Sequence, residues 1–178
     1  VHLDTTPGRE TFRVVIQNDV YFDFSELQGN SIESDLNKRD FTFNAMAVPL
    51  KNFIKGTKNF IDPHNGKDDI KNKVIRMLPD SAFLNDPLRM LRAFRFMSTI
   101  GFKIEDNTFS RIKKLKTKIS QVAPERIYNE LILLLSSEKA SSSMSSMHDS
   151  GLLKCILPSL YKNQALLPSL RVLDHLEK

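Results

Sequence analysis

The stretch that decides how the second half of the chain folds is Asn85-Asp-Pro-Leu-Arg-Met-Leu-Arg-Ala-Phe-Arg-Phe96. Its apolar residues recur with the period of an α-helix, and an Asp-Pro pair is a common way to begin one. We therefore predict a helix over Pro87–Ile100. Arg89, Arg92 and Arg95 recur every three residues, so they form a slanted stripe along one flank of this helix.

Three guanidinium groups beside a wide apolar face need counter-charges, and the helix itself offers only Asp86 at its start. A phosphate-bearing ligand would neutralise them. The stripe is equally well explained as surface arginines whose stems cover the core. Asp86 could cap the helix and still present its second carboxylate oxygen to the edge of a base. The helix alone leaves a nucleotide site and a solvated face both open.

Upstream of this helix the pattern is mixed. Two β-rich runs, Thr11–Ile16 and Val20–Ser25, predict a hairpin. Alternation along the second run places its even-numbered residues on a core face and Asp23 on the open face. Two short helices are predicted at Ser31–Leu36 and Phe41–Ala47. Beyond them we expect a turn at 62–66, a helical turn at 67–71, a strand at 74–77, and helices at 106–118, 124–135, 140–149 and in the last thirty residues.

The composition is that of a globular chain: 178 residues, 40% hydrophobic, 26% charged and a net charge of +5. No apolar run approaches the roughly 20 residues that span a bilayer. One cysteine, Cys155, excludes an internal disulfide and a cysteine zinc site and indicates a reducing, cytoplasmic compartment. The four histidines have no metal-ligand spacing. The chain opens on Val1-His-Leu-Asp4, so we interpret it as part of a longer protein.

Two further clusters could carry chemistry. Arg39, Asp40 and Asn44 converge at the start of a predicted helix, which suits a sugar hydroxyl and a phosphate; a capping Asp beside a surface Arg explains them as well. A cationic run has no acid between Asp106 and Glu125, and is either a solvated helix face or an RNA-backbone contact. Its members are Arg111, Lys113, Lys114, Lys116 and Lys118.

Four segments, in order, resemble successive motifs of the class II tRNA nucleotidyltransferase (CCA-adding enzyme) and bacterial poly(A) polymerase family. They are Arg39–Ala47, Phe60–Gly66, Asn85–Phe96 and Ala123–Ile127, and the resemblance extends from about residue 10 to the end. It implies an α+β fold: part of a nucleotidyltransferase head with a short mixed sheet, then an all-α neck and the start of an all-α body. The implied domains are 1–78, 79–139 and 140–178.

The resemblance also implies roles. Arg39 and Asp40, with Asn44 beside them, match the motif that recognises the ribose of the incoming nucleotide. Asp86 and Arg89 match the pair that hydrogen-bonds the Watson–Crick edge of CTP or ATP; Asn85 stands where the motif has Glu. The other implied roles are triphosphate binding for Arg92 and Arg95, neck support for Glu125 and Arg126, and a flexible head–neck motif for Asp62 and Gly66.

The family's metal-binding Asp-x-Asp pair does not occur in this sequence. Asp23 matches an acidic position near that pair, so we expect it as a third carboxylate or as an ordinary surface Asp. The implied activity is addition of CMP and AMP from CTP and ATP to the 3′ end of tRNA with Mg²⁺ as cofactor. We expect this chain alone to be inactive. Alternatives are a poly(A) polymerase, an enzyme adding only A or only C, a non-catalytic RNA-binding module, or a proteolytic fragment.

Overall fold

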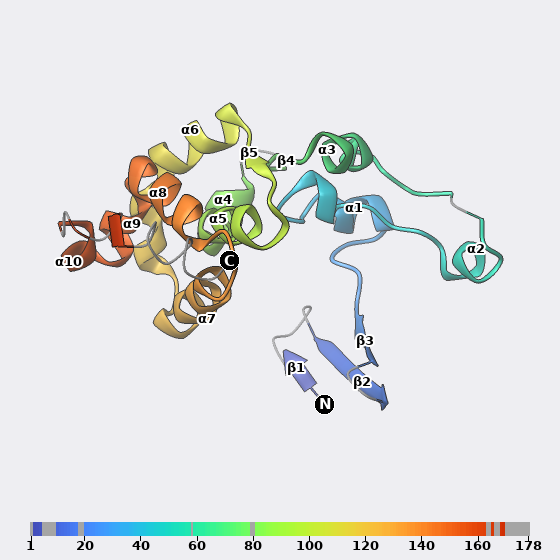
Figure 1. The fold of residues 1–178 in the computed structure, drawn as a ribbon. Helices are drawn as coiled ribbons and strands as arrows, with labels where there is room; N and C mark the ends of the chain where they lie inside the picture. Colours follow the sequence, from blue (N-terminus) through green and yellow to red (C-terminus); the bar gives the residue numbers. More distant parts are fainter. Residues whose placement is uncertain are drawn as a thin grey trace.

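The computed structural model describes residues 2–4, 10–17, 20–57, 59–78, 81–162, 165 and 168–169. Figure 1 shows a mixed α+β arrangement, which confirms the predicted fold class: a small sheet near the N-terminus, a middle segment of short elements, and a packed group of helices. In the described part of the chain, no helix has both the length and the apolar character needed to cross a membrane.

The N-terminal sheet contains three antiparallel strands, β1 (His2–Asp4), β2 (Thr11–Gln17) and β3 (Val20–Ser25). The predicted hairpin is therefore confirmed, with Phe12 opposite Phe24. The predicted core face is wrong: Phe24 and its even-numbered neighbours on β3 are more than half exposed. No helix or second sheet of the described chain covers this hairpin, so alternation alone does not bury either face (Figure 1).

The segment after the hairpin forms α1 (Ile32–Leu36), which Ser31 caps by accepting from the backbone N–H of Ser34 at 3.2 Å. The helix predicted at Phe41–Ala47 is wrong. Only a 3₁₀ turn, η1 (Thr42–Asn44), forms there.

Long-range pairing explains why this segment is not an α-helix. Phe41 forms a β-bridge with Met77, and Ala47 forms another with Ile61. Both ends of the segment are therefore extended, and only three residues remain to coil. Local helical propensity is overridden by partners distant in sequence.

The middle segment continues with α2 (Leu50–Ile54) and α3 (Gly66–Asn72). β4 (Val74–Ile75) then pairs in parallel with β5 (Lys103–Ile104). The strand predicted over 74–77 is thus two residues long, followed by the bridge at Met77.

The rest of the described chain is mainly helical, and the helices predicted at 106–118, 124–135 and 140–149 are found there, whereas much of the helical region predicted in the last thirty residues lies outside the described residues. Its helices are α4 (Ala82–Asn85), α5 (Leu88–Ile100), α6 (Asp106–Leu115), the 3₁₀ helix η2 (Lys116–Gln121), α7 (Pro124–Leu135), α8 (Ala140–Ser150), α9 (Leu152–Ile156) and α10 (Pro158–Tyr161). The helix predicted to reach Lys118 changes to a 3₁₀ helix at Lys116. Ile119 of η2 is buried, and so is Val122, which follows the helix in extended conformation.

Helix α5 is the centre of the main core. Met90, Leu91 and Phe94 are fully buried, and the helix packs against α7 and α8 (Figure 1). Its opposite flank faces η1, where Phe41 and Phe43 meet Phe96 edge to face. The aromatic contact fixes the arginine flank of α5 against the segment that carries Arg39 and Asp40.

Candidate functional site

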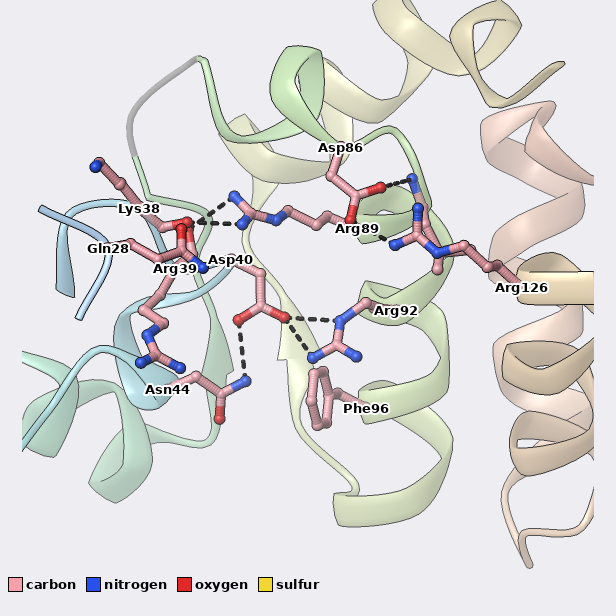
Figure 2. A pocket seen from close by; sticks show the side chains of 11 residues that line it. Gln28, Lys38, Arg39, Asp40, Asn44, Asp86, Arg89, Arg92, Phe96 and Arg126 are labelled. Atoms are coloured by element: carbon pink, nitrogen blue, oxygen red, sulfur yellow. Dashed lines mark hydrogen bonds and ion pairs between the residues drawn. The ribbon is translucent and has the colours of Figure 1, made fainter. Parts of the chain in front are cut away.

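A cavity of about 500 Å³ lies between the 38–44 segment and the first turns of α5 (Figure 2). It is lined by Gln28, Lys38, Arg39, Asp40, Asn44, Asp86, Leu88, Arg89, Arg92, Phe96 and Arg126. Predicted ribose-binding and base-reading residues, which lie about fifty positions apart in sequence, therefore share one cavity. Its volume falls within the range of small-ligand sites.

Not every predicted site residue reaches this cavity. Asp23, Asp62, Gly66, Arg95 and Glu125 are not among its lining residues. The cavity is strongly cationic, since five Lys or Arg residues face two carboxylates. Such a balance suits a polyanionic ligand.

Asp40 connects the two walls of the cavity. Its Oδ1 accepts from the backbone N–H of Phe41 at 2.9 Å and from Nδ2 of Asn44 at 3.1 Å. Its Oδ2 accepts from Nε of Arg92 at 2.8 Å and also pairs with Nη2. The side chain is buried, so these bonds fix the carboxylate in one orientation.

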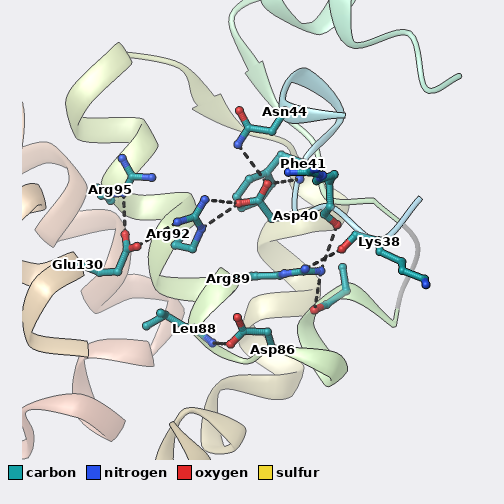
Figure 3. A network of polar contacts seen from close by, with 12 residues as sticks. Lys38, Asp40, Phe41, Asn44, Asp86, Leu88, Arg89, Arg92, Arg95 and Glu130 are labelled. Atoms are coloured by element: carbon teal, nitrogen blue, oxygen red, sulfur yellow. Dashed lines mark hydrogen bonds and ion pairs between the residues drawn. The ribbon is translucent and has the colours of Figure 1, made fainter. Parts of the chain in front are cut away.

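The arginine stripe, for which the sequence left a ligand phosphate and a solvated face both open, finds counter-charges within the protein. Glu130 of α7 accepts from Nη1 of Arg92 at 3.1 Å and from Nε of Arg95 at 2.6 Å (Figure 3). Burial opposes the charge of Arg92, but Asp40 and Glu130 outweigh that effect and raise the pKa of its guanidinium. Arg92 is therefore held charged between Asp40 and Glu130 of α7.

Asp86 and Arg89 lie at the start of α5. Oδ1 of Asp86 accepts from the backbone N–H of Leu88 at 3.2 Å, although Pro87 and not Asp86 occupies the N-cap position of α5. Its second oxygen accepts from Nη2 of Arg126 at 2.8 Å. Arg126, predicted as neck support, thus touches the predicted templating residue directly.

Arg89 reaches across the cavity to the opposite wall (Figure 2). It donates to the backbone carbonyls of Lys38 at 2.6 Å and Arg39 at 3.1 Å, and to that of Ala82 at 3.4 Å. The backbone of the predicted ribose motif is thereby tied to the helix that carries the predicted base-reading pair.

Asp62 and Gly66 build a turn next to the site. Asp62 accepts from the backbone N–H groups of Gly66 at 2.7 Å and Lys67 at 3.1 Å, so it caps α3. A Cβ on Gly66 would stand 2.3 Å from the carbonyl oxygen of Thr42. Only glycine allows α3 to lie this close to η1.

Asp23 lies on the exposed hairpin, away from the cavity. It forms a two-point ion pair with Arg13, at 2.7 and 2.8 Å. The hydrogen bond from Arg13 lowers the pKa of the Asp23 carboxyl. Its position as a third carboxylate stays a prediction.

The cationic run occupies α6 and η2, and none of its members lines the cavity. Lys113, Lys114 and Lys118 are exposed, whereas Arg111 and Lys116 are partly buried. Glu125 is exposed in the first turn of α7. The arrangement leaves three lysine ammonium groups accessible to a polyanion.

Two acidic positioning contacts were missed by the sequence reasoning. Asp35 binds the side chain of Arg39, and Glu130 binds those of Arg92 and Arg95. The first could have been found, because residues four apart on a helix are neighbours. The second joins residues 38 and 35 positions apart, which no local pattern reveals.

In the described part of the chain, no group of three or more His, Cys, Asp or Glu side chains is placed to hold a metal ion. The carboxylates at the cavity are engaged by arginines and backbone N–H groups instead. These residues do not fit the two-metal centre that the resemblance implies, and we assign no chemical step to a metal held by them.

Known families match both halves of the chain. Residues 5–76 match the family model of the poly(A) polymerase head domain, and residues 101–163 match the probable RNA- and SrmB-binding site of polymerase A. The chain is 42% identical over 144 residues to the CC-adding tRNA nucleotidyltransferase of Halalkalibacterium halodurans, covering 80% of this chain and 36% of that protein. It is 34% identical over 157 residues to the A-adding tRNA nucleotidyltransferase of Deinococcus radiodurans, covering 85% of this chain and 35% of that protein.

A solved structure of a tRNA-processing enzyme with CTP superposes with a TM-score of 0.82 at 28% identity. The match covers 95% of this chain and 47% of that one. The chain spans about a third of the length of the curated relatives it matches.

Proposed function

Because this chain belongs to the family of tRNA nucleotidyltransferases and poly(A) polymerases, we propose that it serves the addition of CMP and AMP, from CTP and ATP, to the 3′ end of tRNA. The observation that carries the proposal is the shared cavity between the 38–44 segment and α5. The relatives named as tRNA nucleotidyltransferases support it.

In this reaction the 3′-hydroxyl of the RNA attacks the α-phosphorus of the bound nucleotide. A phosphodiester bond forms, the bond between the α- and β-phosphates breaks, and pyrophosphate leaves. Enzymes of this family use divalent metal ions, and we propose Mg²⁺. The chain's own residues supply recognition: they bind the nucleotide, orient it and select its base and sugar.

Asp86 and Arg89 are proposed to read the base. A carboxylate offers about four acceptor sites, so Asp86 can accept from an amine while it keeps Leu88 and Arg126. Cytosine and adenine each carry an exocyclic amine, whereas uracil carries a carbonyl at that position. This difference gives Asp86 a reason to accept C and A and to reject U.

Arg39, Asp40 and Asn44 are proposed to recognise the ribose, and Arg92 and Arg95 the triphosphate. Arg92 lines the cavity; Arg95 lies one turn further along α5 and shares Glu130 with it. Glu125 and Arg126 are proposed to support the base-reading helix from the neck. The cationic run of α6 and η2 is proposed to contact the RNA backbone.

We further propose that the activity is cytoplasmic, since one cysteine in 178 residues suits a reducing compartment. Addition of only C or only A is the second candidate, because relatives of both kinds match this chain. Poly(A) addition shares the same chemistry. We expect the 178-residue chain alone to bind nucleotide without transferring it, because its sequence contains no Asp-x-Asp.

The proposal is tested by nucleotide titration of the chain and its Asp86→Ala variant by calorimetry. We expect the unaltered chain to bind CTP and ATP more tightly than UTP. The variant should bind all three alike, because the triphosphate contacts remain while the base reader is gone. Equal weakening for every nucleotide would mean that Asp86 only caps α5, and no binding to the unaltered chain would overturn the proposed function.

A further inference from the structure

Asp35 is the most deeply buried carboxylate in the part of the chain that the structure describes, with 1% of its surface exposed. It lies in the last turn of α1, outside the cavity lining and outside every motif named above. A carboxylate is kept in such a place only if its oxygens are fully bonded. Its partners therefore show what it does.

Both partners of Asp35 are cavity residues. Its Oδ1 accepts from the backbone N–H of Gln28 at 2.8 Å. Its Oδ2 accepts from the side chain of Arg39, from Nε at 2.9 Å and from Nη2 at 2.5 Å. Gln28 and Arg39 both line the cavity, so one buried group fixes two parts of its wall.

The side chain of Arg39 needs such an ion-pair partner to keep one conformation. Its side chain is 46% exposed and comes from a short connection rather than from a long helix. A free arginine at such a place samples many rotamers, and each nucleotide that it recognises would have to order it. The ion pair with Asp35 orders it in advance. The burial of Asp35 also protects the pair from screening by salt.

We propose that Asp35 is a positioning residue, which holds the guanidinium of Arg39 in place for recognition of the nucleotide's ribose. Asp35 does not touch the nucleotide; it acts through Arg39. The inference rests on the proposed function, because it takes Arg39 as a ribose contact.

The test compares binding of CTP and dCTP to the 178-residue chain and to Asp35→Asn. Asparagine keeps an oxygen for the N–H of Gln28 but loses the charge that holds Arg39. The proposal predicts that the preference for CTP over dCTP falls about tenfold, the size of one charged hydrogen bond. Glu33→Gln, an exposed acid on the same helix, should leave the preference unchanged.

A double-mutant cycle separates positioning from general support. In an Arg39→Ala background, Asp35→Asn should not change the ratio of the two dissociation constants any further, because the residue it acts through is absent. A further change in that background would show that Asp35 affects the site by another route, and would overturn the proposal.

One further measurement uses the unaltered chain and therefore does not depend on the folding of a variant. In the unaltered chain, the Nε–H of Arg39 should give a slowly exchanging NMR signal, and a fast-exchanging one would contradict the proposal. The nucleotide titrations distinguish failure of the proposed function from failure of the proposed role of Asp35. A chain that binds no nucleotide refutes the proposed function, whereas a chain that prefers CTP and keeps that preference in Asp35→Asn refutes only the role of Asp35.

Discussion

Gly66 shows how one small residue determines the approach of two elements. It begins α3 directly beneath η1, and a Cβ there would stand 2.3 Å from the carbonyl oxygen of Thr42 and 3.0 Å from Cγ of Met46. The first of these contacts is to backbone, which cannot rotate away. Because η1 contains Asn44 of the cavity wall and follows Asp40 closely, the packing under Gly66 also supports the site.

Gly66→Ala should lower the free energy of unfolding by about 1–3 kcal/mol, the usual cost of overpacking. The sign of this change is informative, because replacing glycine by alanine at an open helix position would instead raise the free energy of unfolding by up to about 1 kcal/mol. Urea denaturation followed by circular dichroism measures it. Lys71→Ala on the exposed side of α3 should change stability by less than about 0.5 kcal/mol, and an equal result for both would contradict the close packing.

At the scale of elements, α5 and α7 are joined by charge as well as by apolar packing. Glu130 pairs with Arg92 and Arg95, and Arg126 of α7 pairs with Asp86. The Glu130 pairs are largely buried, whereas Arg126 is half exposed. The buried ion pairs of Glu130 with Arg92 and Arg95 should therefore contribute to stability. Exposed ion pairs contribute little to stability, so we expect the pair of Arg126 with Asp86 to matter for recognition instead.

Glu130→Ala should destabilise the helical part by about 3 kcal/mol, because Arg95 loses its Glu130 ion pair and Arg92 keeps only the one with Asp40. Glu130→Gln should cost less, since it still offers an oxygen. Glu138→Gln, an exposed acid beyond the end of α7, is the matched control. Thermal and urea unfolding would measure the stability of all three variants. A Glu130→Ala variant as stable as the control would show that the ion pairs of Glu130 do not stabilise the protein.

The elements also show what sequence could and could not predict. Pro87 and Gly101 bracket α5, and its apolar period is strong, so its bounds were predicted within one residue. The segment after Asp40 was predicted as a helix, because nothing local reveals the bridges to Met77 and Ile61. Local sequence patterns do not reveal contacts between distant residues, so they also could not identify Glu130 as the partner of the arginine stripe.

On the scale of the whole molecule, the chain has two faces of different chemistry. The cavity presents arginines and carboxylates that converge on a small volume. The run on α6 and η2 presents exposed lysines with no acid among them. A small triphosphate fits the first, and an extended RNA backbone fits the second. The domain boundaries at 78 and 139 stay predictions, although α8, beyond the second, packs on α5.

Lys113→Ala and Lys114→Ala should each weaken binding of tRNA uniformly and reduce the slope of log affinity against log salt by about one. Binding of CTP should not change, because neither lysine lines the cavity. Filter binding of labelled tRNA over a range of salt concentrations measures the slope, with Lys71→Ala as control. A slope unchanged in both variants would mean that this face does not contact RNA.

The position of CTP in a crystal structure of the chain tests the central claim most directly. We predict the cytosine edge against Asp86 and Arg89, and the ribose against Arg39 and Asp40, inside the cavity of about 500 Å³. A nucleotide bound elsewhere on the chain, or one whose cytosine edge faces solvent while its triphosphate alone is held, would contradict the account.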